Sequence, residues 1–280
     1  MMLPMYEGRM GHQFNHRFAS LGDPDRQTTV NELESADFVV QPQYWVSEEE
    51  TLRRLERRTW GTESALLGHR RVARNNDERT CIAGLLPRGA TSYGWIVSSG
   101  PSAMELCMLE AAFNSFAYDY LLRGSFSQPS IPQSTSEQVP VPTMQLIADS
   151  PIVDAMWIRD RVLELSYTSN DMCPLAQELG ESGPAFVWNE ERRSLIRAEL
   201  DAAFLHLYGV TREDADHILD SFPLVRGKDE AQFDEFRTKR IVLDIFDAMQ
   251  HAIHTGEPYR TILAPAPGHG PRHEMQEVAT

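Results

Sequence analysis

A polar, proline-rich segment at residues 124–143 divides this 280-residue chain into two regions with different sequence patterns. It holds four prolines among many Ser and Gln residues, a composition typical of a loop or linker. Before it, apolar and partly β-branched runs at 80–86 and 91–97 flank a Pro-Arg-Gly-Ala turn. This pattern predicts two strands that form a hairpin or lie adjacent in one sheet. The first region is therefore expected to contain a small sheet.

Beyond the proline-rich segment every apolar pattern has the helical period. In the first region, Ser102 caps a long predicted helix that ends at Gly124, and Ser47 with Glu50 forms a capping box. The chain is therefore predicted to be α+β, with a mixed small-sheet N-terminal domain followed by an all-helical C-terminal domain. The helices expected in the second region span 151–168, 173–180, 189–208, 211–221 and 229–255.

The composition is that of an ordinary globular protein. No run approaches the roughly 18 apolar residues of a membrane span, and the first residues lack the basic and apolar blocks of a signal peptide. We therefore expect a cytoplasmic location and no membrane partner. The cysteines are far apart and form no CxxC pair, so we expect buried, reduced thiols at Cys81, Cys107 and Cys173.

Motifs for the commonest cofactors and nucleophiles are missing from the sequence. Neither the dinucleotide pattern G-x-G-x-x-G nor the phosphate loop G-x-x-x-x-G-K-[ST] occurs. No Ser lies in a G-x-S-x-G elbow, and Lys228 and Lys239 match no nuclease pattern. We therefore expect no nucleotide cofactor and no catalytic residues in this chain on its own.

Positive charge is concentrated in one window. The formal net charge of −15 argues against a nucleic-acid binder, yet residues 53–88 carry nine Arg against four acidic residues, a net of +5. Arg suits bidentate contacts to phosphate or guanine. The alternative is a solvated helix face in an Arg-rich protein. The candidate DNA-binding residues are Arg53, Arg57, Arg70, Arg71, Arg74 and Arg79.

Residues 6–18 mix His, Arg, Glu, Gln and Asn with aromatics, unlike an ordinary amphipathic strand or helix. We call this stretch the opening motif and interpret it as functional, with plain core packing as the alternative. The spacing of His12 and His16 would allow a shared metal on one helix face, but no third ligand has the usual spacing. The candidate residues of the motif are Tyr6, Glu7, His12, Gln13, His16 and Arg17.

Four segments together are distinctive. They cover residues 3–18, 76–80 leading to Pro87, 113–123 followed by 138–142, and 207–210 continuing to 236–240. In these segments the sequence resembles the C-terminal part of bacterial type IIG restriction-modification and phage-defence adenine-specific DNA methyltransferases. That part comprises a TaqI-like specificity region and a helical C-terminus.

The resemblance implies a division of the chain. Residues 1–35 would join a methyltransferase lobe, 36–145 would form a DNA target-recognition domain, and 146–263 a helical domain. Composition predicts a disordered tail at 264–280. Complete family members use S-adenosylmethionine and hold the flipped adenine with an Asn-Pro-Pro-Tyr motif. Because neither the Gly-rich motif nor that tetrapeptide occurs here, the resemblance implies a non-catalytic portion without its own cofactor.

These observations leave more than one hypothesis. In the first, the chain recognises double-stranded DNA for a methyltransferase catalytic lobe or subunit, and the opening motif lies at the seam, with its polar residues partly without partners. In the second, it is a stand-alone, non-catalytic interaction protein of a defence system, whose acidic helical domain docks a partner. A third is a metal-dependent enzyme that uses His12 and His16.

Overall fold

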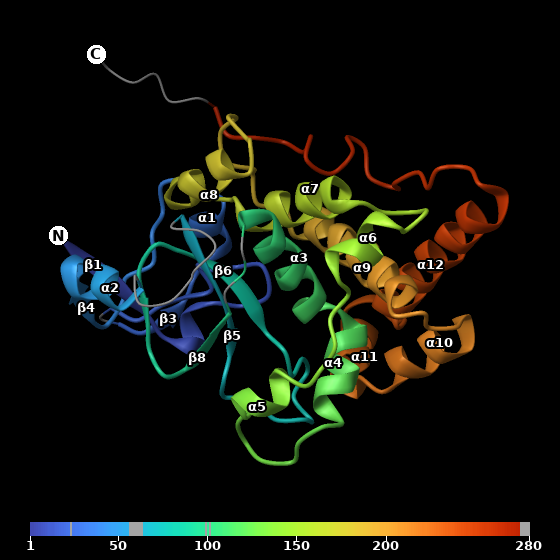
Figure 1. Cartoon of the computed structure of the whole chain (residues 1–280), viewed down its shortest axis with the longest axis horizontal. Coiled ribbons are helices and arrows are strands. Elements are labelled where there is room, and N and C mark those ends of the chain that lie inside the picture. Colours follow the sequence, from blue (N-terminus) through green and yellow to red (C-terminus); the bar gives the residue numbers. More distant parts are fainter. Residues whose placement is uncertain (23, 56–63, 99, 101, 275–280) are drawn as a thin grey trace.

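The computed structural model describes residues 1–22, 24–55, 64–98, 100 and 102–274. Within these ranges all named strands lie before residue 99, and every named element from Ala103 onward is helical. Figure 1 shows the strands gathered on one side of the molecule and the last helices on the other. The fold is α+β, as the sequence predicted.

The described strands form three small sheets. In the first, β1 (Met2–Tyr6) pairs antiparallel with β4 (Trp45–Ser47) and parallel with β7 (Ala90–Thr91). The second pairs β2 (Ala19–Ser20) with β3 (Arg26–Gln27). The third has the order β6-β5-β8, and its strands are β5 (Ala65–Arg70), β6 (Ala83–Pro87) and β8 (Trp95–Ser98).

The third sheet corrects one prediction. The runs at 80–86 and 91–97 do not form a hairpin or lie adjacent, because β5 lies between β6 and β8 and pairs antiparallel with both. Residues 65–69 of β5 are buried, which places an apolar central strand inside the Arg-rich window. Charged neighbours in the sequence conceal this strand.

Serine hydroxyls set several helix boundaries. As predicted, Ser47 accepts from the Glu50 amide at 3.5 Å at the start of α2 (Glu48–Leu55), and Ser102 accepts from the Glu105 amide at 3.3 Å. A single helix over 102–123 is wrong. Ser115 is extended and its hydroxyl caps a second helix, so the chain forms α3 (Ala103–Asn114) and α4 (Phe116–Arg123).

The region after α4 is helical, as expected. The predicted helix at 229–255 is nevertheless two helices, because Asp234, at φ 60°, ends the first of them in the left-handed conformation. The remaining helices of the described residues are η1 (Gly8–Met10), α1 (Val30–Leu33), α5 (Gln133–Ser136), α6 (Met144–Ala148), α7 (Ala155–Ser166), η2 (Asn170–Met172), α8 (Cys173–Glu178), α9 (Glu190–Leu207), α10 (Arg212–Asp220), α11 (Pro223–Phe233) and α12 (Arg237–Thr255).

One hydrophobic core joins the sheet to the helices. The largest cluster includes Leu67 and Leu85 of the third sheet, Phe113 of α3, Leu163 of α7 and Phe204 of α9. A second cluster packs α9, α10 and α12 around Phe116, Phe222 and Phe246. Residues on both sides of position 145 therefore share one core, and the domain boundary there stays a prediction.

The C-terminal segment corrects a further prediction, the disordered tail at 264–280, of which residues 275–280 lie outside the described residues. Residues 264–274 are not a disordered tail, because Arg272 pairs with Glu181 at 2.9 Å and lies 3.7 Å from the centre of the Phe186 ring. The Gly268 amide donates to Glu164 at 2.8 Å. Figure 1 shows this segment running back from α12 past α7 toward α8. Charge pairing fixes a stretch whose Pro, Gly and His content had suggested disorder.

Cys81 and Cys107 are buried, as predicted, whereas Cys173 is only half-buried, and all three are free thiols. Burial raises the pKa of the Cys107 thiol. No helix in the described part of the chain is long and apolar enough to cross a membrane.

Candidate functional site

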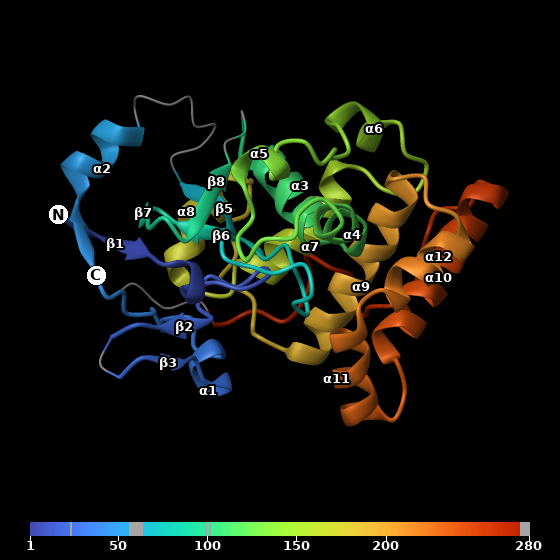
Figure 2. The same cartoon turned by 90° about the horizontal axis from the view of Figure 1, so that it is seen from below.

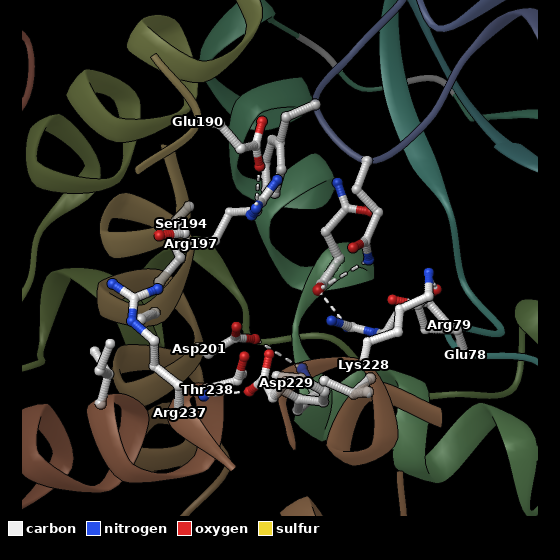
Figure 3. Close-up of a pocket in the computed structure, with 18 of the residues that line it drawn as sticks. Glu78, Arg79, Glu190, Ser194, Arg197, Asp201, Lys228, Asp229, Arg237 and Thr238 are labelled. Carbon is white, nitrogen blue, oxygen red and sulfur yellow. Dashed lines mark hydrogen bonds and ion pairs between the residues drawn. The ribbon is translucent and has the colours of Figure 1, made fainter. Parts of the chain in front are cut away.

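A cavity of about 470 Å³ lies where the opening motif meets the helical region. It receives His12 and Gln13 from the opening motif, Arg79 from the loop before β6, and residues around the α3–α4 break. The helices α9, α11 and α12 supply the rest of its wall, as Figure 3 shows. The lining also includes Glu78, Glu190, Glu191, Ser194, Arg197, Asp201, Lys228, Asp229, Arg237 and Thr238.

All four sequence segments that carry the family resemblance contribute to this cavity. Residues 12–14 come from the first segment, 78–79 from the second, 114–116 from the third and 237–238 from the fourth. The contacts between them are direct: the Gln13 side-chain amide donates to the backbone carbonyls of Cys81 and Asn114, at 3.2 and 3.3 Å. Segments far apart in the chain therefore meet at one place.

Arg79 is held by a buried ion pair beside the cavity. Its Nε lies 2.8 Å from Asp119, whose side chain is fully buried and also accepts from Arg123 at 3.2 Å. The guanidinium covers the Phe116 ring at 4.1 Å. These contacts fix the orientation of Arg79 and join the loop before β6 to α4.

Asp201 of α9 lies at the inner end of the cavity, where its side chain is 6% exposed. One carboxylate oxygen accepts from the Phe116 amide at 2.9 Å, at the first residue of α4, and the described residues supply no other hydrogen bond to this side chain. Burial raises the pKa of Asp201 to about 6, against the opposing effect of the positive charges of Arg79 and Arg197. A carboxylate with an open oxygen therefore faces the cavity.

His12 adds a neutral imidazole to the wall. Burial, together with the positive charges of Arg70, Arg197, Arg79 and Lys228, lowers its pKa to about 3. Its ring packs against Phe18 with the centroids 4.8 Å apart, and within the described part of the chain it has no hydrogen-bond partner. At neutral pH it can donate or accept one hydrogen bond without adding charge.

The remaining cations are paired with exposed glutamates. Arg197 lies 2.8 Å from Glu190, which is 62% exposed. Arg237 pairs with Glu191, which is 64% exposed, and Lys228 pairs with Glu78. Exposed pairs of this kind contribute only about 0–1 kcal/mol, so an anionic ligand can displace the glutamates at little cost.

Other residues of the opening motif hold the fold. Arg17 is fully buried and donates to the carbonyls of Leu33, Ser35 and Thr168, at 2.9, 2.7 and 2.9 Å, and more weakly to those of Glu32 and Phe38. This guanidinium ties the end of α1 to the chain that follows α7. Burial lowers its pKa to about 10.

His16 has a contact set that superficially resembles a catalytic triad. Its Nε2 lies 3.1 and 3.2 Å from the two oxygens of Asp171 and 3.1 Å from the hydroxyl of Ser169. In a triad the carboxylate and the hydroxyl bind opposite ring nitrogens. Here both contact the same nitrogen, so the geometry has no proton relay and His16 serves as a buried cross-link.

Tyr6 and Glu7 stand apart from the cavity. Tyr6 is buried in a small core with Met10 and Trp95, and burial raises the pKa of its phenol. Glu7 lies at the start of η1, 3.9 Å from Arg9. Among the described residues one oxygen of Glu7 and Nε of Arg17 lack partners, whereas the side chains of Gln13 and His16 have partners within this chain. Gln13 and His16 therefore join parts of this chain, and the junction of residues 1–35 to a methyltransferase lobe stays a prediction.

The candidate arginines do not form one surface. Arg53 lies on α2, at the opposite end of the molecule from α10–α12 in Figure 2, and pairs with Glu50 at 2.6 Å. Arg70 donates to the Gly11 carbonyl, and burial lowers its pKa to about 10. Arg71 covers the exposed ring of Tyr93 at 4.3 Å.

The last two candidate arginines of the window are Arg74, which the structure describes, and Arg57, which it does not. The Arg74 side chain is exposed and has no partner among the described residues. Arg57 lies outside the described residues.

The structure also adds residues that the sequence interpretation missed. Ser194, Arg197 and Asp201 have helical spacing on α9 and face the cavity, but the sequence offered only that spacing as a signal. No cluster of three or more His, Cys, Asp or Glu side chains that could hold a metal occurs within the described ranges. His12 and His16 do not converge, since His16 faces Asp171.

No protein-family model, curated protein or solved structure matches this chain.

Proposed function

We propose that this chain is the DNA target-recognition and C-terminal portion of a site-specific adenine DNA methyltransferase of a restriction-modification or phage-defence system. It acts with a methyltransferase lobe that binds the methyl donor, on double-stranded DNA, in the cytoplasm. The chain itself lacks the Gly-rich and Asn-Pro-Pro-Tyr motifs, so S-adenosylmethionine belongs to that lobe. Its contribution is to bind and orient the duplex.

The convergence of the four resembling segments on one cavity carries this proposal. A resemblance that arose by chance would have no reason to select residues that meet in space. These residues instead pack around Gln13, Arg79 and Asp119, which hold the sheet region against α4. The arrangement suits a module that presents its sheet region to DNA in a fixed orientation.

The structure sharpens which arginines the proposal needs. Arg74 is exposed and unpaired among the described residues, and Arg53 pairs only with the exposed Glu50. Arg71 covers the Tyr93 ring and donates to the Tyr93 carbonyl at 3.1 Å, both at the surface, where a phosphate can compete for it. Arg70 and Arg79 are held by the Gly11 carbonyl and by Asp119, so we assign them to positioning. The DNA contacts are therefore expected from Arg53, Arg71 and Arg74.

Duplex binding tests the proposal directly. Fluorescence anisotropy with a labelled duplex should give an affinity that falls with salt, with a slope of about −0.9 per phosphate contact. The chain mixed with a lobe that bears both missing motifs should transfer methyl groups to that duplex, and each part alone should not. Absence of binding at low salt, together with no effect of substituting Arg71 and Arg74, would overturn the proposal.

The second candidate is a stand-alone interaction protein, and one observation favours it. Most described arginines of the window already have partners within the chain, so the region need not contact phosphate. The acidic helices would then dock a partner protein. Duplex binding that is weak and does not depend on salt supports this second function over the first.

A further inference from the structure

The cavity offers two kinds of recognition group within one small volume. Asp201, at its buried end, presents a hydrogen-bond acceptor with an open oxygen. Arg197 and Arg237 present cations whose present partners, Glu190 and Glu191, are largely exposed. Figure 3 shows these groups on different sides of one space. A matching ligand has a hydrogen-bond-donating end and an anionic end.

The volume restricts the size of that ligand. About 470 Å³ lies within the roughly 300–1,000 Å³ range of small-molecule sites. One nucleotide fits such a space, whereas a base-paired duplex does not. Any nucleic acid that enters must therefore present a single nucleotide that is unpaired.

We propose that the cavity binds one unpaired nucleotide of a DNA strand whose base carries an exocyclic amino group. Asp201 accepts a hydrogen bond from that amino group, as acidic side chains do from cytosine N4. Arg197 and Arg237 exchange their glutamate partners for the phosphate. This inference rests on the proposed function, because that function is what supplies the DNA.

Two further contacts suit the same ligand. His12 is uncharged at neutral pH and has no hydrogen-bond partner among the described residues, so it can contact a sugar or base without repelling a cationic wall. Cations lie close to His12, since the positive charges of Arg70, Arg197, Arg79 and Lys228 help to lower its pKa. A phosphate that displaces the exposed glutamates can pair with cations of this kind.

Single-stranded oligonucleotides test the proposal. Anisotropy at neutral pH and low salt should show oligo(dC) and oligo(dA) bound about tenfold more tightly than oligo(dT), which lacks an amino group. Asp201→Asn should reduce this ratio to near one, because the new amide can keep the Phe116 contact through its oxygen but then turns its NH₂ toward the base. Circular dichroism melting of the variant checks that it folds.

Matched variants separate the base from the phosphate. Arg197→Ala should weaken all three oligonucleotides equally, by about fivefold, because it touches only the phosphate. Arg212→Ala is the control. Arg212, the first residue of α10, pairs with Asp247 of α12 at 2.8 Å and does not line the cavity. It should change binding less than twofold.

The possible results distinguish a failure of the cavity proposal from a failure of the proposed function. Equal binding of oligo(dC) and oligo(dT), or a preference for oligo(dC) that remains in Asp201→Asn, would overturn the cavity assignment. If the duplex still binds in a salt-dependent way, the proposed function is unaffected by that result. If neither strand nor duplex binds, both fail. If dCMP competes fully with oligo(dC) at the same concentration, the ligand is a free nucleotide. That result would overturn the assignment of the ligand to a DNA strand.

Discussion

The layer between the sheet and the helices and the outer end around α2 both contain many arginines, but they use them in opposite ways. In the layer, Arg17 and Arg79 are at most 10% exposed and bind backbone carbonyls or a buried carboxylate. At the outer end, Arg53 is 59% exposed and binds only the exposed Glu50. The residue that an arginine contacts determines its role, and the number of arginines nearby in the sequence does not.

The largest effect is expected in the buried layer. Arg17→Met should destabilise the protein by about 5 kcal/mol, because several buried carbonyls would lose their donor at once. Urea unfolding measures this change. Arg17→Lys keeps the charge but has fewer donors, so it should cost about half as much. A loss below 1 kcal/mol for Arg17→Met would remove the distinction between the two regions.

Asp119→Asn tests the second buried arginine. The substitution leaves Arg79 and Arg123 side by side without their shared counter-ion, which should cost about 3 kcal/mol. Thermal melting of Asp119→Asn beside Glu50→Gln, which removes the exposed partner of Arg53, gives the matched comparison. A similar shift for both variants would show that burial is not what separates them.

Glu110 extends the comparison to a buried acid. Its oxygens accept from the Leu85 amide at 2.9 Å and from the Ser166 hydroxyl at 3.0 Å, and burial raises its pKa to about 8. The folded-state pKa is raised above the unfolded value, so this contribution to stability is complete below the unfolded pKa and is lost as pH rises toward 8. Stability should fall by up to about 1.4 kcal/mol per pH unit between pH 6.5 and 8.

Glu110→Gln provides the control for that pH dependence. The amide is neutral throughout; its oxygen can accept from the Leu85 amide and its NH₂ can donate to the Ser166 hydroxyl. Its stability should therefore stay nearly constant over the same range. Urea unfolding at several pH values compares the two proteins. The histidines with lowered pKa values, His12, His69, His206 and His273, affect stability mainly below pH 6.5, outside this pH range. Parallel pH profiles for both proteins would contradict the assignment.

The smallest effects on stability are expected for exposed arginines, Arg53 at the outer end and Arg74 in the loop between β5 and β6. Arg53→Ala and Arg74→Ala should change the free energy of unfolding by less than about 0.5 kcal/mol. If they contact phosphate, each should reduce the salt slope of duplex binding by about 1. Binding measured across salt concentrations tests this. An unchanged slope in the double variant would assign both arginines to solvation alone.

Local signals were enough to predict much of the helical region. Periodicity and capping placed α9 and α10 within one residue of the observed ends, and Ser102 marked the start of α3. Gln13 and His12 were candidates because of their composition, and both line the cavity.

Long-range contacts explain what the sequence could not predict. Asp201 becomes notable only because α9 brings it to the Phe116 amide, 85 residues away along the chain. Arg79 read as a surface residue because its partner Asp119 is 40 residues distant. The break at Ser115 depends on a hydroxyl that donates to the Ala112 carbonyl of α3 and accepts from the Tyr118 amide of α4, and helical periodicity does not record such contacts.

The segment after α12 affects the order in which the protein can fold. Tyr259 and Thr261 donate to the buried Glu199, at 2.7 and 2.6 Å, and Arg272 reaches back to Glu181. A ribosome adds these residues after the helices that they hold have been made. Until they emerge, Glu199 has Arg161 as a partner but not these two hydroxyls. The helical region therefore reaches its final packing only after residues 259–272 have been added.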